Sequence, residues 1–169
     1  FWPDAKYFDS ANFSVTRLVN NLRAKAVLCP GLEITFTDKV NNKDYKWHYE
    51  DGLKDYLAEG VKGYTVLPEE PFTGEFSAET EAANWAVIWQ PEGGEMITES
   101  YVNLIPTAQG GTHVNGLRQG LLDAMREFCE FRNLLPRGVK LTGDDVFDRC
   151  SYVLSVKIQD PQFAGQTKE

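Results

Sequence analysis

The feature that most constrains the fold is a dense run of apolar and aromatic residues from Ala83 to Gln90, with Trp85–Trp89 at its centre. A run this short and this apolar is typical of a strand buried inside a sheet. Apolar and polar residues alternate from Tyr152 to Ile158, which predicts a second strand that ends at Asp160-Pro161. The chain is therefore expected to build a sheet that other elements cover.

Two long stretches have the period of an amphipathic helix. Apolar residues recur at intervals of three and four after the expected N-cap Ser14, until Cys29-Pro30 interrupts the pattern. The longest such pattern runs from Val114 to Cys129 and predicts a helix that ends near residues 133–136. Two shorter helices are also expected, over Leu53–Val61 behind a capping Asp51, and at residues 142–147 behind a Thr142–Asp145 capping box.

The remaining segments complete a mixed fold. A period of two predicts a hairpin with strands around Ile34–Phe36 and Tyr45–Tyr49, and a further strand from about Met96 to Ile105. Residues 64–82 contain prolines, glycines and acidic residues, which predict a surface loop. The order of helix, two strands, helix, two strands, two helices and strand predicts an α+β domain, in which a mixed sheet carries helices mostly on one face.

Length and charge limit the functions to consider. The chain has 169 residues and a formal charge of −8, from 17 basic and 25 acidic side chains. The length fits a single globular domain. The acidity excludes the overall positive field that drives autonomous nucleic-acid binding, so any DNA contact must come from a local patch. No run of about 18 apolar residues occurs, which favours a soluble, cytoplasmic protein.

The two ends of the sequence indicate a piece of something longer. The chain begins at Phe1 rather than at a methionine. It ends at Lys168-Glu169, directly after a segment that no turn or helix terminates. We therefore expect a fragment whose partners lie partly in its own polypeptide.

Metal and thiol chemistry find little support. Cys29, Cys129 and Cys150 are far apart, form no C-x-x-C pair, and cannot complete a zinc set with the two histidines. Reduced thiols in the core are expected. The acidic pairs Glu69-Glu70 and Asp144-Asp145 fit a surface loop and the first turn of a helix, so no metal site is predicted.

Gly110-Gly111-Thr112-His113 precedes the longest helix, where free backbone N–H groups can hold an anion. The same residues also fit a simple turn with a threonine cap. The helix dipole disfavours a cation at His113, so a neutral hydrogen-bonding role is expected for it rather than general acid-base catalysis. A small phosphate-ligand enzyme built around residues 110–113 is one possible function.

Basic residues gather between positions 118 and 140, against the acidic background of the chain. They fit either the solvated face of a helix and its following loop, or a local patch that faces DNA. A non-enzymatic nucleic-acid or protein-binding module that uses this face is a second possible function. The residues are Arg118, Arg126, Arg132, Arg137 and Lys140.

The C-terminal residues Gly165, Gln166, Thr167 and Lys168 combine a glycine with an amide and an ammonium group. In an extended chain, positions i and i+2 project to the same side. Gln166 and Lys168 can then close on one anionic group such as a terminal phosphate, while Thr167 faces away. The spacing alone equally describes an exposed tail.

Two long blocks carry a family resemblance. Tyr101–His113 (YVNLIPTAQGGTH), with Gly116 and Leu117, resembles the transducer domain of bacterial type IIA DNA topoisomerase ATPase subunits, and so does Leu154–Lys168 (LSVKIQDPQFAGQTK). The blocks have the family's order and about its spacing. The segment Asn103–Thr107 resembles the topoisomerase IV branch more closely than the gyrase branch. Weaker matches, in Phe1–Asp4 and Ala24–Gly31, extend the resemblance over essentially the whole chain, residues 1–169.

The resemblance implies a fold like domain 2 of ribosomal protein S5, with a left-handed βαβ crossover. It implies that Gln166 and Lys168 contact the γ-phosphate of ATP, supported by Gly165 and Thr167, in the site of an upstream ATPase domain. The chain would couple ATP binding and hydrolysis to DNA strand passage, decatenation and relaxation.

The resemblance also implies the cofactors and partners of the whole enzyme. The complete subunit would use ATP and Mg²⁺, and neither is expected to bind this fragment, which should be inactive alone. The implied partners are the upstream ATPase domain, a second copy of the subunit, a DNA-cleaving partner subunit and DNA. The implied location is the bacterial cytoplasm, at the nucleoid.

Overall fold

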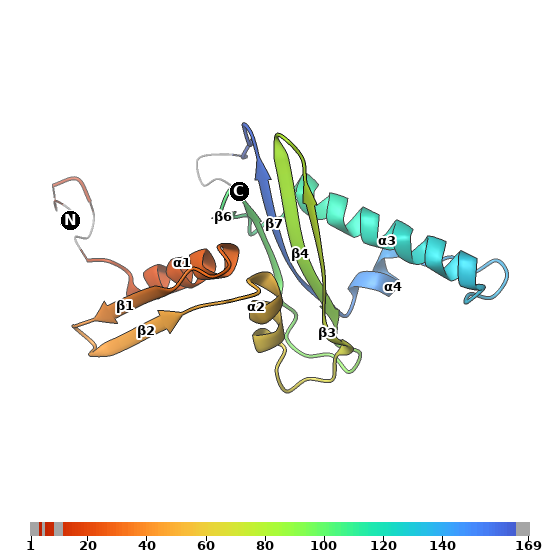
Figure 1. Cartoon of the computed structure of the whole chain (residues 1–169), viewed down its shortest axis with the longest axis horizontal. Helices are drawn as coiled ribbons and strands as arrows, with labels where there is room; N and C mark the ends of the chain where they lie inside the picture. The colour runs from red at the N-terminus through yellow and green to blue at the C-terminus, as the bar shows by residue number, and fades with distance from the viewer. Residues whose placement is uncertain (1–3, 5, 9–11, 165–169) are drawn as a thin grey trace. The chain divides into compact units, whose positions relative to one another are not determined.

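The structure is a computed structural model that describes residue 4, residues 6–8 and residues 12–164. The chain divides into two compact units, residues 1–52 and residues 53–169. The ribbon runs from red in the first unit to blue at the end of the second (Figure 1).

The first unit contains α1 (Val15–Leu28) and a two-stranded antiparallel sheet of β1 (Ile34–Asp38) and β2 (Lys43–Trp47). The Ser14 hydroxyl accepts a hydrogen bond from the Arg17 backbone N–H at 3.4 Å, which confirms the predicted N-cap. The last turn of α1 is buried as the helix packs on both strands. The predicted helix and hairpin are therefore confirmed.

Aromatic side chains line one face of that hairpin. The rings of Phe36 and Tyr45 are stacked with centroids 5.7 Å apart, and those of Tyr45 and Trp47 are stacked at 5.6 Å. Phe36 and Tyr45 are directly paired in the register of β1 and β2. Cross-strand aromatic pairs stabilise a two-stranded sheet that backbone hydrogen bonds alone would hold only weakly.

The second unit is built on a five-stranded mixed sheet with the strand order β3-β4-β7-β5-β6 (Figure 1). β5 and β7 are parallel, and the other neighbouring strands are antiparallel. The elements are α2 (Leu53–Gly60), β3 (Leu67–Ser77), β4 (Glu81–Trp89), β5 (Thr98–Val102), β6 (Ile105–Pro106), α3 (Thr112–Arg132), α4 (Gly143–Phe147) and β7 (Cys150–Ile158). The chain passes from β5 to the parallel β7 through α3 and α4, which makes a βαβ unit.

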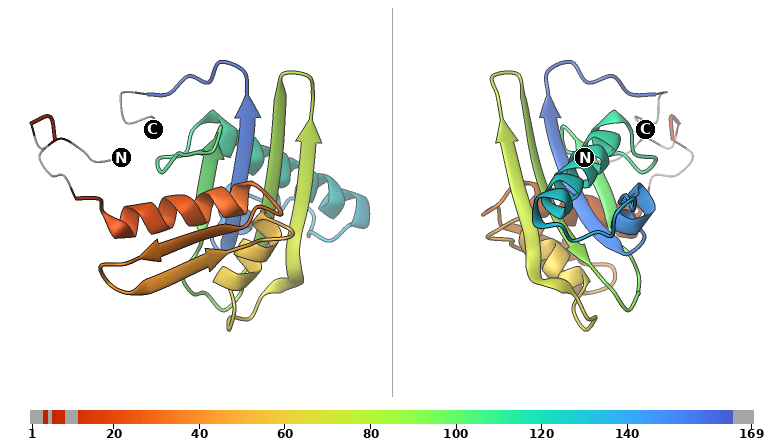
Figure 2. Two further views of the ribbon diagram at one scale, coloured as in Figure 1. Left: turned by 60° about the vertical axis from the view of Figure 1, so that its left-hand side comes forward. Right: turned by 90° about the vertical axis from the view of Figure 1, so that its right-hand side faces the viewer.

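Helices cover both faces of the two central strands, β4 and β7. On one face, the Tyr56 hydroxyl of α2 donates to the Glu99 carboxylate at 2.7 Å, and Glu99 is paired in the register with the fully buried Val153. On the other face, α3 lies over Trp85 and Leu154 (Figure 2). Helices α3 and α4 form the expected layer on one face, but α2 covers the opposite face as well.

The predicted loop at residues 64–82 is wrong, because eleven of these residues form β3. Phe72 and Phe76 pair with Val87 and Ala83 of β4. Their side chains therefore lie on the same face of the sheet as Trp85. The prolines are tolerated because β3 is an edge strand and its register shifts between Leu67 and Phe72. Proline and acidic content concealed the strand.

The strand predicted from Met96 to Ile105 is interrupted. Asn103 and Leu104 both have positive φ, 48° and 66°, and they form a two-residue turn between β5 and β6. The predicted capping box of α4 is confirmed, since the Thr142 N–H donates to the Asp145 carboxylate at 2.8 Å and the Thr142 hydroxyl accepts from the Asp145 N–H at 3.4 Å. Of the helices in the described part of the chain, none has the length and apolar character that a bilayer crossing requires.

Gly74 tests the packing of the sheet. The Trp85 indole lies over this glycine on the neighbouring strand, and a Cβ at Gly74 would overlap the ring. We expect Gly74→Ala to lower the free energy of unfolding by about 1–3 kcal/mol, because a close-packed core resists an added methyl group. Chemical denaturation measures the change. Gly120→Ala is the matched control, since its Cβ would meet no atom within 4 Å, and a helical Gly→Ala change is expected to stabilise by up to about 1 kcal/mol. Equal stabilities of the two variants would contradict the packing.

Candidate functional site

β7 is the helix or strand of the described structure nearest in sequence to the predicted phosphate contacts. Gly165, Gln166, Thr167 and Lys168 lie outside the described residues. β7 is the central strand of the sheet, between β4 and β5, and it ends at Ile158. The geometry of the candidate site is therefore that of the residues that fix this strand end.

Asn103 holds the end of β7 on the side of β5. Its Oδ1 accepts a hydrogen bond from the Ile158 backbone N–H at 3.0 Å, and its Nδ2 donates to the Ile158 carbonyl at 2.9 Å. The Asn103 backbone N–H donates to the Val156 carbonyl at 2.9 Å. In the sequence, Asn103 is part of a motif that carries the family resemblance, and no role is predicted for it. An asparagine directly after a strand was the available signal, because asparagine tolerates the left-handed turn conformation.

The β4 side of the same strand end is fixed by backbone. Glu81, the first residue of β4, is paired with Ile158 in the register. The Gln159 N–H donates to the Thr80 carbonyl at 3.1 Å. The point at which the chain leaves the sheet is thus held from both sides.

A buried polar chain connects the β5–β6 hairpin to the start of α3. The Ser100 and Thr107 hydroxyls are 2.7 Å apart, and the Thr107 hydroxyl is 2.9 Å from His113 Nε2. The Ser100 hydroxyl also donates to the Thr107 carbonyl at 3.0 Å. Ser100 and Thr107 are buried, so these bonds satisfy groups that would otherwise be costly to remove from water.

Burial lowers the pKa of His113, which favours the neutral ring at pH 7. Together with the bond to Thr107, this agrees with the expected neutral hydrogen-bonding role. The expected threonine cap is wrong, since Gly111 is the N-cap, with a φ of 147° and no side-chain bond, and Thr112 lies inside α3. Glycine adopts a positive φ more readily than other residues, so Gly111 takes the N-cap position and Thr112 becomes the first residue of the helix.

Two of the five predicted DNA-facing residues connect α3 to α4 or to the loop between these helices. The Arg118 guanidinium lies 4.7 Å from the centre of the Phe147 ring of α4. Arg126 Nε donates to the Leu141 carbonyl at 2.8 Å, and its guanidinium is 3.7 Å from the Asp123 carboxylate. These contacts attach the loop after α3 and α4 to the helix.

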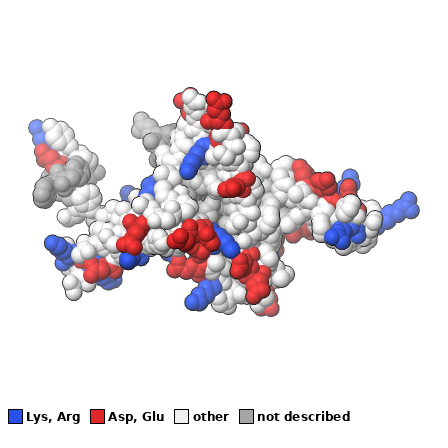
Figure 3. Space-filling model, in the orientation of Figure 1, with Lys and Arg blue, Asp and Glu red and all other residues white. Residues whose placement is uncertain are grey.

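The other three predicted residues are exposed at the far end of α3. Arg132 lies 5.6 Å from the centre of the Phe128 ring, and Arg137 and Lys140 follow in the loop. Basic and acidic groups are interspersed at this end (Figure 3). Arg118 and Arg132 are fourteen positions apart, roughly 21 Å along the helix axis, so the five residues are spread along α3 and the loop after it.

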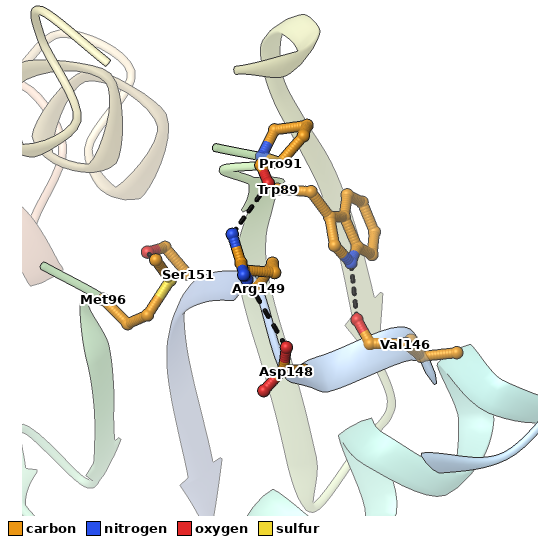
Figure 4. Close-up of polar contacts among 7 residues, drawn as sticks. All are labelled: Trp89, Pro91, Met96, Val146, Asp148, Arg149 and Ser151. Atoms are coloured by element: carbon orange, nitrogen blue, oxygen red, sulfur yellow. Dashed lines mark hydrogen bonds and ion pairs between the residues drawn. The ribbon is translucent and has the colours of Figure 1, made fainter. Parts of the chain in front are cut away.

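The opposite end of β7 is held by side chains that sequence reasoning treated as core or left aside (Figure 4). Trp89 Nε1 donates to the Val146 carbonyl of α4 at 2.6 Å, and Arg149 donates to the Pro91 carbonyl at 2.8 Å. The fully buried Ser151 hydroxyl donates to Gln90 Oε1 at 2.5 Å. An indole or guanidinium bonded to a distant carbonyl leaves no periodic signal in the sequence.

In the described part of the chain, potential metal ligands do not cluster and the cysteines form no disulfide. Within the described ranges, no three His, Cys, Asp or Glu side chains gather in a way that could hold a metal ion. The three cysteines are free, and burial raises the pKa of the Cys150 thiol to about 12. Glu70 instead pairs with Lys54 at 2.7 Å, and this hydrogen bond lowers the pKa of the Glu70 carboxyl.

The lowered pKa of His113 predicts a pH-dependent stability. Below the ordinary histidine pKa the unfolded chain takes up a proton that the folded protein resists, so the free energy of unfolding should fall as pH drops from 7 to 5. Replacing His113 by Gln should flatten this fall. Chemical denaturation at a series of pH values measures it. The control His48→Gln removes the other histidine, in the first unit, and should keep the contribution of His113. An unchanged slope in His113→Gln would contradict the lowered pKa of this half-buried ring.

Comparison with known proteins gives a consistent result. A family model described as DNA gyrase B matches residues 52–169. The B subunit of DNA topoisomerase 4 from Salmonella typhimurium is 72% identical over 169 residues, covering 100% of this chain and 27% of that protein. The corresponding protein of Haemophilus influenzae is 73% identical with the same coverage. The chain thus spans about a quarter of the length of these relatives.

Solved structures agree with the sequence matches. A topoisomerase IV ATP-binding domain of Francisella tularensis, in complex with a small-molecule inhibitor, aligns with a TM-score of 0.81 and 43% identity, over 100% of this chain and 45% of that one. The 43K ATPase domain of Thermus thermophilus gyrase B, in complex with an aminocoumarin, aligns with a TM-score of 0.82 and 27% identity, over 96% of this chain and 44% of that one.

Proposed function

The chain belongs to the DNA gyrase B family, and on that premise we propose that it is the transducer region of an ATP-dependent type II DNA topoisomerase, in the ATPase subunit of a topoisomerase IV. Its role is to couple ATP binding and hydrolysis in a neighbouring ATPase domain to DNA strand passage, decatenation and relaxation. Residues 53–169 are the best candidate for this role, because the family match begins at residue 52 and the second compact unit at residue 53. The assignment of all residues 1–169 to one transducer domain stays a prediction.

One observation supports this role above the others. The central strand β7 is fixed at both ends, by Asn103 and Thr80 where it leads toward Gly165–Lys168, and by Trp89 and Arg149 where α4 enters it. A strand held in this way moves with the sheet rather than independently of it. A contact made after the end of β7 would therefore displace the whole sheet, together with α4 and α3.

Gln166 and Lys168 are donors that suit an anionic phosphate oxygen. In the complete subunit, the Lys168 ammonium and the Gln166 amide would hold the γ-phosphate of ATP, with Gly165 and Thr167 as the supporting loop, and would stabilise its charge during hydrolysis. Loss of that phosphate removes their partner, and the contact opens.

The free energy available from the phosphate contacts is better matched to a dimer than to a single subunit. Charge-assisted hydrogen bonds contribute about 1.5–3 kcal/mol each. A switch from 1:99 to 99:1 requires about 5.5 kcal/mol. One loop is marginal, whereas two loops in a closed dimer suffice to rotate the two transducer units and gate the passage of DNA.

The proposed function implies the partners and cofactors of such an enzyme. They are the upstream ATPase domain with its ATP and Mg²⁺, a second copy of the subunit, a DNA-cleaving partner subunit, and DNA. Its place would be the bacterial cytoplasm. We further propose the fold of ribosomal protein S5 domain 2 with a left-handed crossover, to which the β5-α3-α4-β7 connection is suited.

Direct DNA contact is best assigned to the exposed basic residues Arg132, Arg137 and Lys140. Arg118 and Arg126 are better understood as structural, because their partners lie in α4 or in the loop between α3 and α4, whereas the Phe128 ring beside Arg132 belongs to the same helix. This division narrows the basic face that the sequence suggested from five residues to three.

The central test is Lys168→Ala in the full-length subunit. Loss of one charge-assisted contact should lower ATP hydrolysis by roughly 10- to 150-fold and suppress decatenation, with the fold intact. Steady-state ATPase and decatenation assays measure both. Lys157→Ala is the matched control, since Lys157 is an exposed lysine on β7 eleven positions earlier. Wild-type rates in Lys168→Ala would contradict the proposed function.

The isolated chain provides a second test. It should hydrolyse no ATP, because the nucleotide site belongs to the neighbouring domain, and it should bind DNA only weakly because of its charge of −8. Tight and steeply salt-dependent DNA binding by the isolated chain, reduced in Arg137→Ala, would instead favour a dedicated nucleic-acid-binding module. A salt titration followed by fluorescence anisotropy separates the two functions.

A further inference from the structure

We propose that Asn103 is a positioning residue for the phosphate-contacting loop, because its side chain fixes the end of β7 from which the chain runs to Gly165–Lys168. The inference rests on the proposed function of that loop. Asn103 itself touches no nucleotide in this scheme, and it acts through the backbone of Ile158.

The geometry shows a side chain that replaces a strand. β5 ends at Val102, which is paired with Val156 of the parallel strand β7. Ile158 lies two residues further along, and both its N–H and its carbonyl are bonded on the side where β5 has already ended. The carboxamide of Asn103 supplies the same donor and acceptor as a peptide group, at 2.9 and 3.0 Å. It thereby extends the sheet by one position without extending the strand.

The residue type follows from the backbone as well as from the bonds. Asn103 has a φ of 48°, in the left-handed region, which asparagine and glycine adopt more readily than other residues. Glycine would suit the turn but offers no carboxamide. Aspartate would suit the turn and keep one acceptor, but it would place a second oxygen against the Ile158 carbonyl. Among residues that tolerate this turn, asparagine alone satisfies both groups of Ile158.

The position of this clamp makes it relevant to the loop. Ile158 is seven residues before Gly165, a short distance for a chain whose far end must reach a particular phosphate oxygen. Gln159 is fixed on the other side by Thr80, so releasing Asn103 would leave the strand end held from one edge only. Small displacements at the start of a reaching segment are costly when catalysis depends on aligned donors.

The experiment uses the full-length subunit assembled with its partner. Asn103→Gly removes both side-chain bonds while keeping the left-handed turn, and Asn103→Asp keeps the bond to the Ile158 N–H. Asn133→Gly is the matched control, because Asn133 also has a positive φ, 51°, at the far end of α3. Lys168→Ala alone and combined with Asn103→Gly completes the set.

We expect Asn103→Gly to lower kcat for ATP hydrolysis about ten-fold with a KM for ATP within about two-fold of wild type, because the rest of the nucleotide site is elsewhere. Asn103→Asp should fall between this variant and wild type, and Asn133→Gly should match wild type. If Asn103 acts through the loop, adding Asn103→Gly to Lys168→Ala should cause no further loss, since interacting positions are not additive.

Three results would overturn the inference. A wild-type kcat in Asn103→Gly beside a slow Lys168→Ala would remove the role of Asn103 and leave the proposed function standing. A full additional ten-fold loss in the double variant would mean that Asn103 acts by another route. Wild-type hydrolysis in Lys168→Ala would overturn the proposed function and this inference with it.

Hydrogen exchange of the Ile158 amide checks the structural step directly. Its N–H should exchange about ten-fold faster in Asn103→Gly, and remain protected in Asn103→Asp, which keeps the acceptor. The amides of β4, such as Val87, should stay protected in both variants and so exclude general unfolding. Unchanged protection of Ile158 in Asn103→Gly would contradict the clamp.

Discussion

The second unit depends on the burial of its two central strands, β4 and β7, on both faces of the sheet. β4 and β7 are paired along their whole length, and their fully buried residues, such as Ala86, Val87 and Val153, point alternately to opposite sides of the sheet. One layer of helices cannot cover such a pair. The chain therefore supplies α2 on one side and α3 with α4 on the other, and the positions of all loops follow from this sandwich.

The fold was predictable where a single physical period dominates. The helical stripe before Cys29, the alternation around Tyr45 and the capping box at Thr142 all became the elements that the sequence indicated. Failures occurred where position in the sheet outweighs local preference. β3 tolerates its prolines because it is an edge strand, and this edge position exists only once the order of the strands is known. Local composition contains no information about strand order.

The chemical groups of the candidate site were predictable, but the hydrogen bonds that hold the ends of β7 in place were not. Donor groups near the C-terminus and a histidine at a helix start could be recognised from residue type and spacing. The Asn103 clamp and the Trp89–Val146 bond join residues 55 and 57 positions apart, so nothing local distinguishes them from ordinary turn and core residues. The Phe147 ring beside Arg118 and the Leu141 carbonyl bonded to Arg126 were not predictable for the same reason, because both lie outside α3, further along the chain.

The short β5–β6 hairpin is bonded at its turn to the end of β7 and, through Thr107, to the first turn of α3. It therefore links the strand end to a helix of 21 residues, about 31 Å long. A rotation of roughly 10° at the first turn of such a helix would displace its far end by about 5 Å. The hairpin thus joins the end of β7 to α3, and the length of α3 sets how far a rotation at its first turn would carry the loop that holds Arg137 and Lys140.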